Sequence, residues 1–230
     1  MKIEIRPPFF ETSVKNYIYG DAVLEYAIAA NTASKEYDID VLFVAPYTEI
    51  RRVRENTDKL IVLAPYMDAI RPGRGIADVL PEALKAAGAQ GVVLNHSERP
   101  MSLNAIKKTI DRANELDLVT FVCADTIAEA QALAMLHPDI INPEPSELIG
   151  SGTVSDIGYV RRVVRAVKVI DQSILVEQAA GINTAQQVYD FIIEGSDAAG
   201  SSSGILTSPN PNSLLNEMVR SVRKARDDLT

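Results

Sequence analysis

The sequence predicts a (β/α)8 barrel in the α/β class, built by one domain that spans residues 1–230. Short apolar runs alternate with amphipathic segments from one end of the chain to the other. Eight such strand–helix units fit this chain length, because parallel strands need helical crossovers and eight of them close into a barrel. No linker, charge block or low-complexity segment interrupts the alternation, and the hydrophobic content of 47% is enough for one large core.

The predicted strands are the short apolar runs, taken in chain order. They cover residues 9–14, 40–44, 60–64, 91–94, 119–123, 140–142, 173–176 and 198–203, the eighth being the least apolar. The segments between them have helical character and cover 21–34, 49–56, 78–87, 103–116, 128–136, 157–169, 185–194 and 213–226. Helix-capping residues precede several of these segments, namely Thr126, Thr184 and Asn212.

An open, doubly wound sheet is the alternative architecture. Such a sheet normally has fewer strands and carries a glycine-rich turn directly after its first strand. The residues that follow the first predicted strand, Lys15-Asn16-Tyr17, contain no glycine. We therefore expect the closed barrel.

Composition excludes several classes of function. A net charge of −8 and a pI near 4.9 argue against binding to nucleic acid or to an anionic membrane, since either needs a basic face. The single cysteine, Cys123, excludes a disulfide scaffold. Because the chain has neither a run of eighteen apolar residues nor a basic-then-apolar leader, we expect a soluble cytoplasmic protein. No His/Asp/Glu cluster has metal-ligand spacing, so we expect no metal and no cofactor.

Three side chains with acid–base or electrostatic potential follow predicted strands. His96 comes after the fourth strand, Glu144 after the sixth and Lys15 after the first. The carboxyl ends of the strands are where α/β barrels carry out their chemistry. Each residue alone would more often be structural or a surface residue. Together they favour a catalytic interpretation, because one mechanism needs all three types.

The segments 95–99, 144–152 and 14–17 together resemble triosephosphate isomerase, specifically its shorter archaeal-type branch, and the resemblance spans nearly the whole chain. It implies a TIM barrel that interconverts a phosphorylated hydroxy-ketone and a hydroxy-aldehyde without a cofactor, in glycolysis and gluconeogenesis. By the same resemblance, Glu144 is the base that moves a proton between C1 and C2. His96 is a neutral imidazole that polarises the carbonyl, kept neutral in this family by a helix N-terminus. Lys15 supplies positive charge beside the enediolate.

The resemblance also implies a lid and a phosphate site. The lid is the loop after the sixth strand and includes Pro145, Ser146, Glu147 and Gly152. Backbone N–H groups at Gly150, Gly181, Ser203 and Gly204 would bind the phosphate, the last two at the start of a short helix. Glu98 would support the site from outside by charge or hydrogen bonding.

The chain departs from this family on one side of the expected pocket. Ser13 stands where the family has an asparagine, and Glu11 shares its strand face, since residues two apart point the same way. The seventh strand continues into Glu177-Gln178, and the eighth is rich in alanine, glycine and serine. Strands seven, eight and one are neighbours in a closed barrel. The pattern suggests a pocket that is larger or more polar, with Glu11 or Gln178 as specificity residues.

Three functional hypotheses remain open. The first is an isomerase of triose phosphate, and the second is the same chemistry on a longer sugar phosphate, such as a tetrulose or pentulose phosphate. The third is a non-catalytic relative that only binds a sugar phosphate. We also expect a homodimer or homotetramer, because Ile76 and Tyr66, in and just before the loop after the third strand, would be exposed in a monomer.

Overall fold

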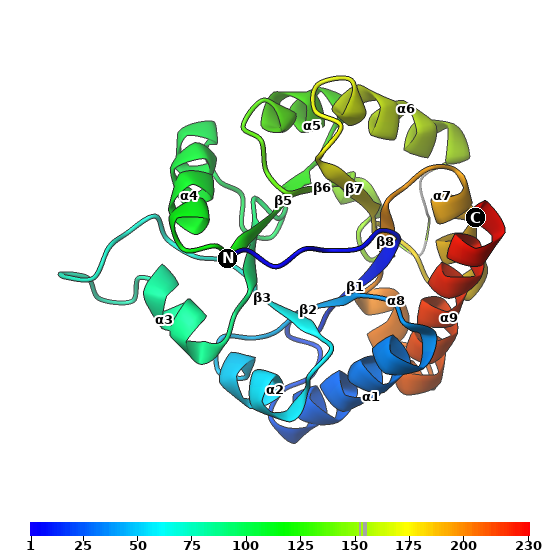
Figure 1. Cartoon of the computed structure of the whole chain (residues 1–230), viewed down its shortest axis with the longest axis horizontal. Coiled ribbons are helices and arrows are strands. Elements are labelled where there is room, and N and C mark those ends of the chain that lie inside the picture. Colours follow the sequence, from blue (N-terminus) through cyan, green and yellow to red (C-terminus); the bar gives the residue numbers. More distant parts are fainter. Residues whose placement is uncertain (152, 154–155) are drawn as a thin grey trace.

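Eight parallel strands close into a barrel in the order β1 to β8, with β8 pairing to β1. The structure is a computed structural model that describes residues 1–151, 153 and 156–230. Helices surround the barrel, as Figure 1 shows in a view down its axis. The prediction of a (β/α)8 TIM barrel is therefore confirmed.

The strands are short and follow the predicted runs closely. They are β1 (Phe9–Ser13), β2 (Val41–Val44), β3 (Ile61–Ala64), β4 (Gly91–Leu94), β5 (Val119–Ala124), β6 (Ile140–Pro143), β7 (Leu175–Gln178) and β8 (Ala198–Gly200). The helices are α1 (Asp21–Tyr37), α2 (Ile50–Asn56), α3 (Pro81–Ala87), α4 (Leu103–Glu115), α5 (Ile127–Ala134), α6 (Ile157–Lys168), α7 (Ala185–Ile193), α8 (Ser203–Leu206) and α9 (Pro211–Leu229). A 3₁₀ turn, η1 (Ser146–Leu148), follows β6.

Element boundaries differ from the predictions where a side chain bonds to the backbone. β7 begins later than expected, because the backbone N–H of Ser173 donates to Asp171 Oδ1 over 2.9 Å and this bond holds a turn there. β8 ends at Gly200 rather than continuing to residue 203, and the Ser201 hydroxyl instead donates to the carbonyl of Ile182 over 2.7 Å.

The predicted caps have two outcomes. Thr126 and Thr184 cap α5 and α7 through their side-chain oxygens, as expected. The predicted cap at Asn212 is wrong, since α9 begins at Pro211, two residues before the predicted start at residue 213, and Asn212 lies inside the helix. Proline suits a first helical position, because its fixed φ is helical and its missing N–H has no partner to lose.

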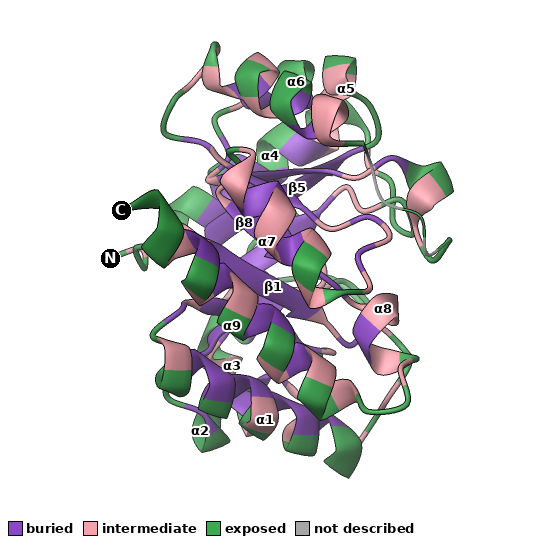
Figure 2. Cartoon of the chain, turned by 90° about the vertical axis from the view of Figure 1, so that its right-hand side faces the viewer, coloured by how far each residue is buried: buried purple, intermediate pink, exposed green. Residues whose placement is uncertain are grey.

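Apolar side chains fill two separate layers. One set, including Phe9, Leu42 and Phe121, lies inside the barrel, and a larger set lies between the strands and the helices. Strand residues alternate between these layers, so Phe10 faces the helices while Phe9 faces the lumen. Figure 2 shows the strands buried and the outer faces of the helices exposed. This alternation decides which polar residues reach the pocket described below.

The loops at the carboxyl ends of the strands lie opposite the two chain termini, as Figure 2 shows. The loop between β3 and α3 projects away from the barrel in Figure 1. Its base is closed at Asp68 and Val79, since Asp68 N donates to Val79 O over 3.0 Å and Val79 N donates to Asp68 Oδ2 over 2.7 Å. Among the helices of the described residues, none is long and apolar enough to cross a membrane.

Candidate active site

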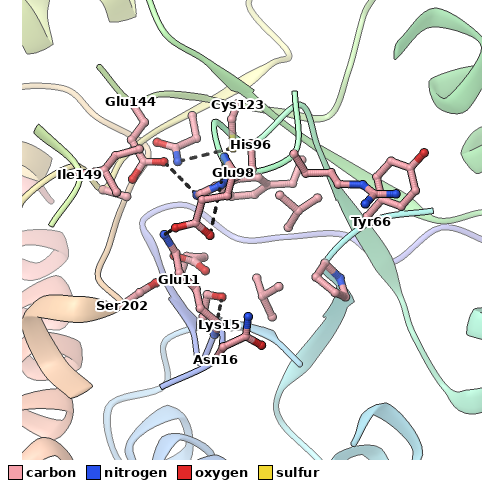
Figure 3. Close-up of a pocket in the computed structure, with 18 of the residues that line it drawn as sticks. Glu11, Lys15, Asn16, Tyr66, His96, Glu98, Cys123, Glu144, Ile149 and Ser202 are labelled. Atoms are coloured by element: carbon pink, nitrogen blue, oxygen red, sulfur yellow. Dashed lines mark hydrogen bonds and ion pairs between the residues drawn. The ribbon is translucent and has the colours of Figure 1, made fainter. Parts of the chain in front are cut away.

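A cavity of about 560 Å³ opens at the carboxyl ends of the strands. Its volume lies in the range of small-molecule sites. Nine of the residues singled out in the sequence line it, and the close-up in Figure 3 shows several of them pointing into the cavity. These nine are Glu11, Ser13, Lys15, His96, Glu98, Glu144, Gly150, Gly181 and Ser203.

The backbone before His96 is held in an unusual conformation by Asn95. Its φ of 57° is left-handed, which asparagine tolerates better than most residues. The Asn95 amide donates to the carbonyl of Cys123 over 3.0 Å and to Glu129 Oε1 over 2.9 Å. Its oxygen accepts from Met101 N over 2.9 Å. These bonds fix the turn that aims His96 into the cavity, a role that the sequence reasoning did not assign to Asn95.

One ring nitrogen of His96 accepts a hydrogen bond, which fixes its tautomer. The backbone N–H of Glu98 donates to His96 Nδ1 over 3.1 Å, so Nε2 carries the proton. The donor belongs to a hydrogen-bonded turn over residues 96–99 rather than to the helix N-terminus that the resemblance implied, since α4 begins at Leu103. Burial lowers the pKa of His96 from its usual value, Lys15 lowers it further, and Glu98 opposes them. The imidazole is neutral near pH 7.

Glu144 faces His96 across the cavity. Its Oε2 lies 3.6 Å from His96 Nε2, and its backbone N–H donates to Ala124 O over 2.7 Å, which anchors it to the end of β5. Burial raises the pKa of the Glu144 carboxyl to about 7, while the charge of Lys15 lowers it and that of Glu98 raises it. A carboxyl with a pKa near neutrality suits a general base.

Lys15 lies just beyond the end of β1, with a left-handed φ of 42°. Such a conformation is unfavourable for lysine, and backbone strain of this kind is concentrated at functional sites. Its ammonium lies 3.2 Å from Glu98 Oε1 and acts electrostatically on His96, Glu144 and Glu11. Glu98 therefore contacts the site twice, through its carboxylate to Lys15 and through its backbone to His96.

The expected lid lies partly at the cavity. Ile149 and Gly150 line it, and the loop is anchored at its start because Ser146 N donates to Asp125 Oδ1 over 2.6 Å. Pro145, Ser146 and Glu147 do not line the cavity, and the last two form the 3₁₀ turn with Leu148. Gly152 lies outside the described residues.

The expected phosphate residues gather beside β7 and β8. Gly181 and Ser203 line the cavity, whereas Gly204 lies just behind them. A Cβ on Gly204 would overlap the carbonyl of Ile182 and lie 2.9 Å from the Ser201 hydroxyl. Only glycine therefore lets the first turn of α8 approach the Gly181 turn this closely.

The side of the cavity formed by β7, β8 and β1 carries buried carboxyl groups. Glu11 reaches the cavity from β1, as the sequence predicted from its shared face with Ser13. Gln178 is buried but does not line the cavity, since Val176 two residues before it faces the helices and Gln178 shares that face. Its neighbour Glu177 faces the lumen instead. Sequence reasoning missed Glu177, although the alternation along β7 was the signal that could have identified it.

The chain is similar along nearly its whole length to known proteins of one family. The family model described as "Triosephosphate isomerase" matches residues 11–185. The triosephosphate isomerase of Sulfurisphaera tokodaii is 33% identical over 227 residues, which cover 97% of this chain and 99% of that protein. The chain belongs to the triosephosphate isomerase family.

Further relatives in this family are also archaeal. The triosephosphate isomerase of Sulfolobus acidocaldarius is 30% identical over 97% of this chain and 98% of its own. That of Methanoculleus marisnigri is 33% identical over 92% of this chain and 97% of its own. The resemblance recognised in the sequence is thus confirmed, including its archaeal character. Members of this family are aldose–ketose isomerases, which are intramolecular oxidoreductases.

Within the described part of the chain, no three His, Cys, Asp or Glu side chains are arranged so that they could hold a metal ion. The buried groups Glu11, Glu177 and Cys123 therefore do not form such a cluster.

Proposed function

We propose that the protein is a triosephosphate isomerase-like enzyme in which Glu144 is the base. The observation that carries the proposal is the pairing of a neutral His96 with a buried Glu144. His96 Nε2–H points across the cavity toward Glu144 Oε2, 3.6 Å away, with the ammonium of Lys15 beside them. A base, a hydrogen-bond donor and a fixed positive charge are what an enediolate intermediate requires.

The reaction balances without any oxidant or reductant. In an aldose, the C2–H bond breaks and its proton goes to the Glu144 carboxylate, leaving an enediolate across C1 and C2. Glu144 returns the proton to C1, while His96 moves a proton from the oxygen on C2 to the oxygen on C1. The product is the ketose, and every group on the protein regains its starting state. Lys15 stabilises the negative charge that develops on the two oxygens.

The phosphate end of the substrate would bind at Gly181, Ser203 and Gly204, which follow β7 and β8, and at Gly150 in the loop after β6. The first N–H groups of α8 have no partner within their own helix, so they are suited to an anion. Closure of the loop that carries Pro145, Ser146, Glu147 and Gly152 would exclude water and protect the enediolate.

Steady-state isomerisation of D-glyceraldehyde 3-phosphate by wild type and by Glu144→Gln tests the base assignment. The amide keeps the size of the side chain but cannot accept the proton, so kcat should fall by about 10²- to 10⁴-fold. Glu25→Gln, on the exposed face of α1, is the matched control and should retain wild-type kcat. Unchanged turnover in Glu144→Gln would overturn the mechanism.

The alternative function is that of a non-catalytic relative, which only binds sugar phosphates. It predicts no turnover of any sugar phosphate by wild type. Retention of a base, a polarised donor and a cation in one cavity favours catalysis, because binding alone does not require them.

We further propose that copies of this chain associate through the loop between β3 and α3. Ile76 in this loop is 93% exposed, which leaves a large apolar side chain in water. Tyr66 is only partly exposed, since the Arg99 guanidinium lies 4.5 Å from its ring centroid. Light scattering coupled to size-exclusion chromatography should give a dimer or tetramer for wild type and for Met135→Asp. Ile76→Asp should give a smaller species, and a monomeric wild type would contradict the proposal.

A further inference from the structure

Two buried carboxyl groups on the β7 and β1 side of the barrel have no hydrogen-bond or ion-pair partner among the described residues. Glu177 is 0% exposed, and neither of its carboxyl oxygens has a hydrogen bond. Glu11 is 6% exposed, and none of the described residues forms a hydrogen bond or ion pair with its carboxyl. Burial of an unpartnered carboxyl is costly, so such groups are retained where a ligand uses them.

The two carboxyls lie side by side on neighbouring parts of the wall. Oxygens of both come within 2.7 Å of the point that a Cβ on Gly200 would occupy. Any larger residue at position 200 would displace them, so Gly200 creates the space in which they meet. Glu11 lines the cavity and Glu177 does not, so only Glu11 can contact a ligand there.

The pair holds at least one proton near neutral pH. The pKa of Glu11 is raised to about 8, chiefly by burial, with the charge of Glu144 adding to the rise and that of Lys15 opposing it. Burial also raises the pKa of Glu177 well above its usual value, with the Glu11 and Glu144 charges adding to the effect. A partly protonated carboxyl pair both donates and accepts hydrogen bonds. A hydroxyl group, which does the same, is the ligand that matches it.

Glu11 lies between the two ends of the proposed substrate site. The reacting end is at His96 and Glu144, and the phosphate end is at the close of β8. The backbone carbonyl of Glu11 accepts from Ser201 N over 3.1 Å, which ties β1 to the residue that follows β8 and precedes the expected phosphate residues Ser203 and Gly204. Figure 3 shows Glu11 projecting into the cavity near Lys15. Ser13, the next residue on the same strand face, has a short side chain that leaves Glu11 accessible from the cavity.

We propose that Glu11, whose carboxyl lies beside that of the buried Glu177, selects a sugar phosphate at least one carbon longer than a triose phosphate by hydrogen bonding to its additional hydroxyl. This inference rests on the proposed isomerase function and names its substrate class. In an aldose phosphate of four or more carbons, hydroxyl-bearing carbons separate the reacting carbons from the phosphate. These hydroxyl-bearing carbons would lie next to the Glu11 carboxyl when the substrate is bound. The proton transfer by Glu144 and His96 is unchanged, and no further reactant is needed.

The test compares kcat/KM for D-glyceraldehyde 3-phosphate, D-erythrose 4-phosphate and D-ribose 5-phosphate. Wild type should prefer one of the two longer substrates. Glu11→Leu should lower kcat/KM for the preferred longer substrate by about 10- to 100-fold more than it lowers kcat/KM for the triose phosphate. Glu11→Gln, which still donates and accepts, should restore part of the loss.

Two variants on β7 separate a specificity role from general damage to the fold. Glu177→Leu acts through Glu11, so it should lower the same preference by a smaller factor, about three- to tenfold. Gln178→Leu removes a buried polar group from the opposite face of the same strand and should leave the preference unchanged. If Glu11→Leu does not fold, the isosteric Glu11→Gln carries the test, with an expected loss of about three- to tenfold for the longer substrate.

Two kinetic results would overturn the inference: a wild-type preference for the triose phosphate, or an equal loss on all three substrates in Glu11→Leu. Failure of this inference can be told apart from failure of the proposed isomerase function by a measurement that needs no turnover. Calorimetry measures the affinity of wild type and Glu11→Leu for 4-phospho-D-erythronate and for 2-phosphoglycolate. If wild type turns over nothing but Glu11→Leu weakens only 4-phospho-D-erythronate, the isomerase proposal fails and hydroxyl recognition stands. If the variant binds both compounds as wild type does, the role of Glu11 is refuted.

Discussion

The two sides of the cavity differ in how their polar groups are satisfied. On the side of β4 and β6, a backbone N–H sets the tautomer of His96, and Glu144 is anchored to β5 and faces Nε2. On the side of β7, β8 and β1, Glu11 and Glu177 are buried without partners among the described residues. Partnered groups hold a fixed geometry, as proton transfer requires. Buried groups without partners reduce stability, and Glu11, which lines the cavity, is available to a ligand.

The largest expected effect is on the partnered side. His96→Gln should lower kcat for sugar-phosphate isomerisation by about 10²- to 10⁴-fold, because the amide cannot relay protons between the two substrate oxygens. His137→Gln is the matched control, since this second histidine is exposed, pairs with Asp171 and does not line the cavity. Steady-state kinetics of both variants measure the difference. Equal losses in the two variants would contradict a specific catalytic role for His96.

On the side formed by β7, β8 and β1, the next largest effect is expected on the free energy of unfolding. Glu177→Leu should raise the free energy of unfolding by about 1–3 kcal/mol at pH 8, because it removes a buried carboxyl without a partner. The folded-state pKa of Glu177 is raised, so the folded protein binds more protons than the unfolded chain above the usual carboxyl pKa. Wild-type stability is therefore lost as pH rises through that window.

Urea denaturation at pH 5 and pH 8 checks this prediction. The gain in Glu177→Leu should be larger at pH 8 than at pH 5, because the wild-type carboxyls are closer to full protonation at the lower pH. A gain that does not depend on pH would indicate better packing instead of the removal of a charge. A loss of stability at both values would show that Glu177 has a partner in solution.

A smaller effect is expected in the pH dependence of catalysis. Because the pKa of Glu144 is about 7 and the base must be ionised, kcat/KM should rise with pH below about 7 and level off above it. Glu98→Gln removes a charge that raises this pKa, so the midpoint should move to lower pH by less than about one unit. The phosphate of the substrate also titrates near pH 6 and contributes to the profile of both enzymes. The informative quantity is therefore the difference in midpoint between wild type and Glu98→Gln, measured with the same substrate. A midpoint that does not move would exclude coupling between Glu98 and the base.

The smallest expected effect lies at Ser13. Ser13→Asn places a longer side chain on the face above Glu11, so it should partly cover that carboxyl. The kcat/KM for D-erythrose 4-phosphate should fall by about three- to tenfold, with little change for D-glyceraldehyde 3-phosphate. Kinetics with the two substrates measure the ratio. An equal fall with both would mean that the added amide disturbs Lys15 rather than access to Glu11.

Local sequence patterns were sufficient for the barrel and for the residues at its mouth. The alternation of apolar runs and amphipathic segments fixes a parallel sheet with helical crossovers, and eight units leave few other architectures. His96, Glu144 and Lys15 each follow a strand directly, so parallel geometry brings them to one edge whatever the details of packing. The caps at Thr126 and Thr184 are equally local and were predicted correctly.

The tertiary structure alone decided which buried polar groups meet. The sequence identified Gln178 as a candidate, but Gln178 shares the helix-facing side of β7 with Val176, and the alternation of the strand directs Glu177 inward instead. The donor to His96 comes from a turn, whose position depends on the bonds of Asn95 to β5 and α5. Strand ends are encoded by neighbours in the sequence, whereas the pairing of Glu11 with Glu177 depends on the closure of β8 onto β1 across the whole chain. That closure is a long-range contact, and no local pattern contains it.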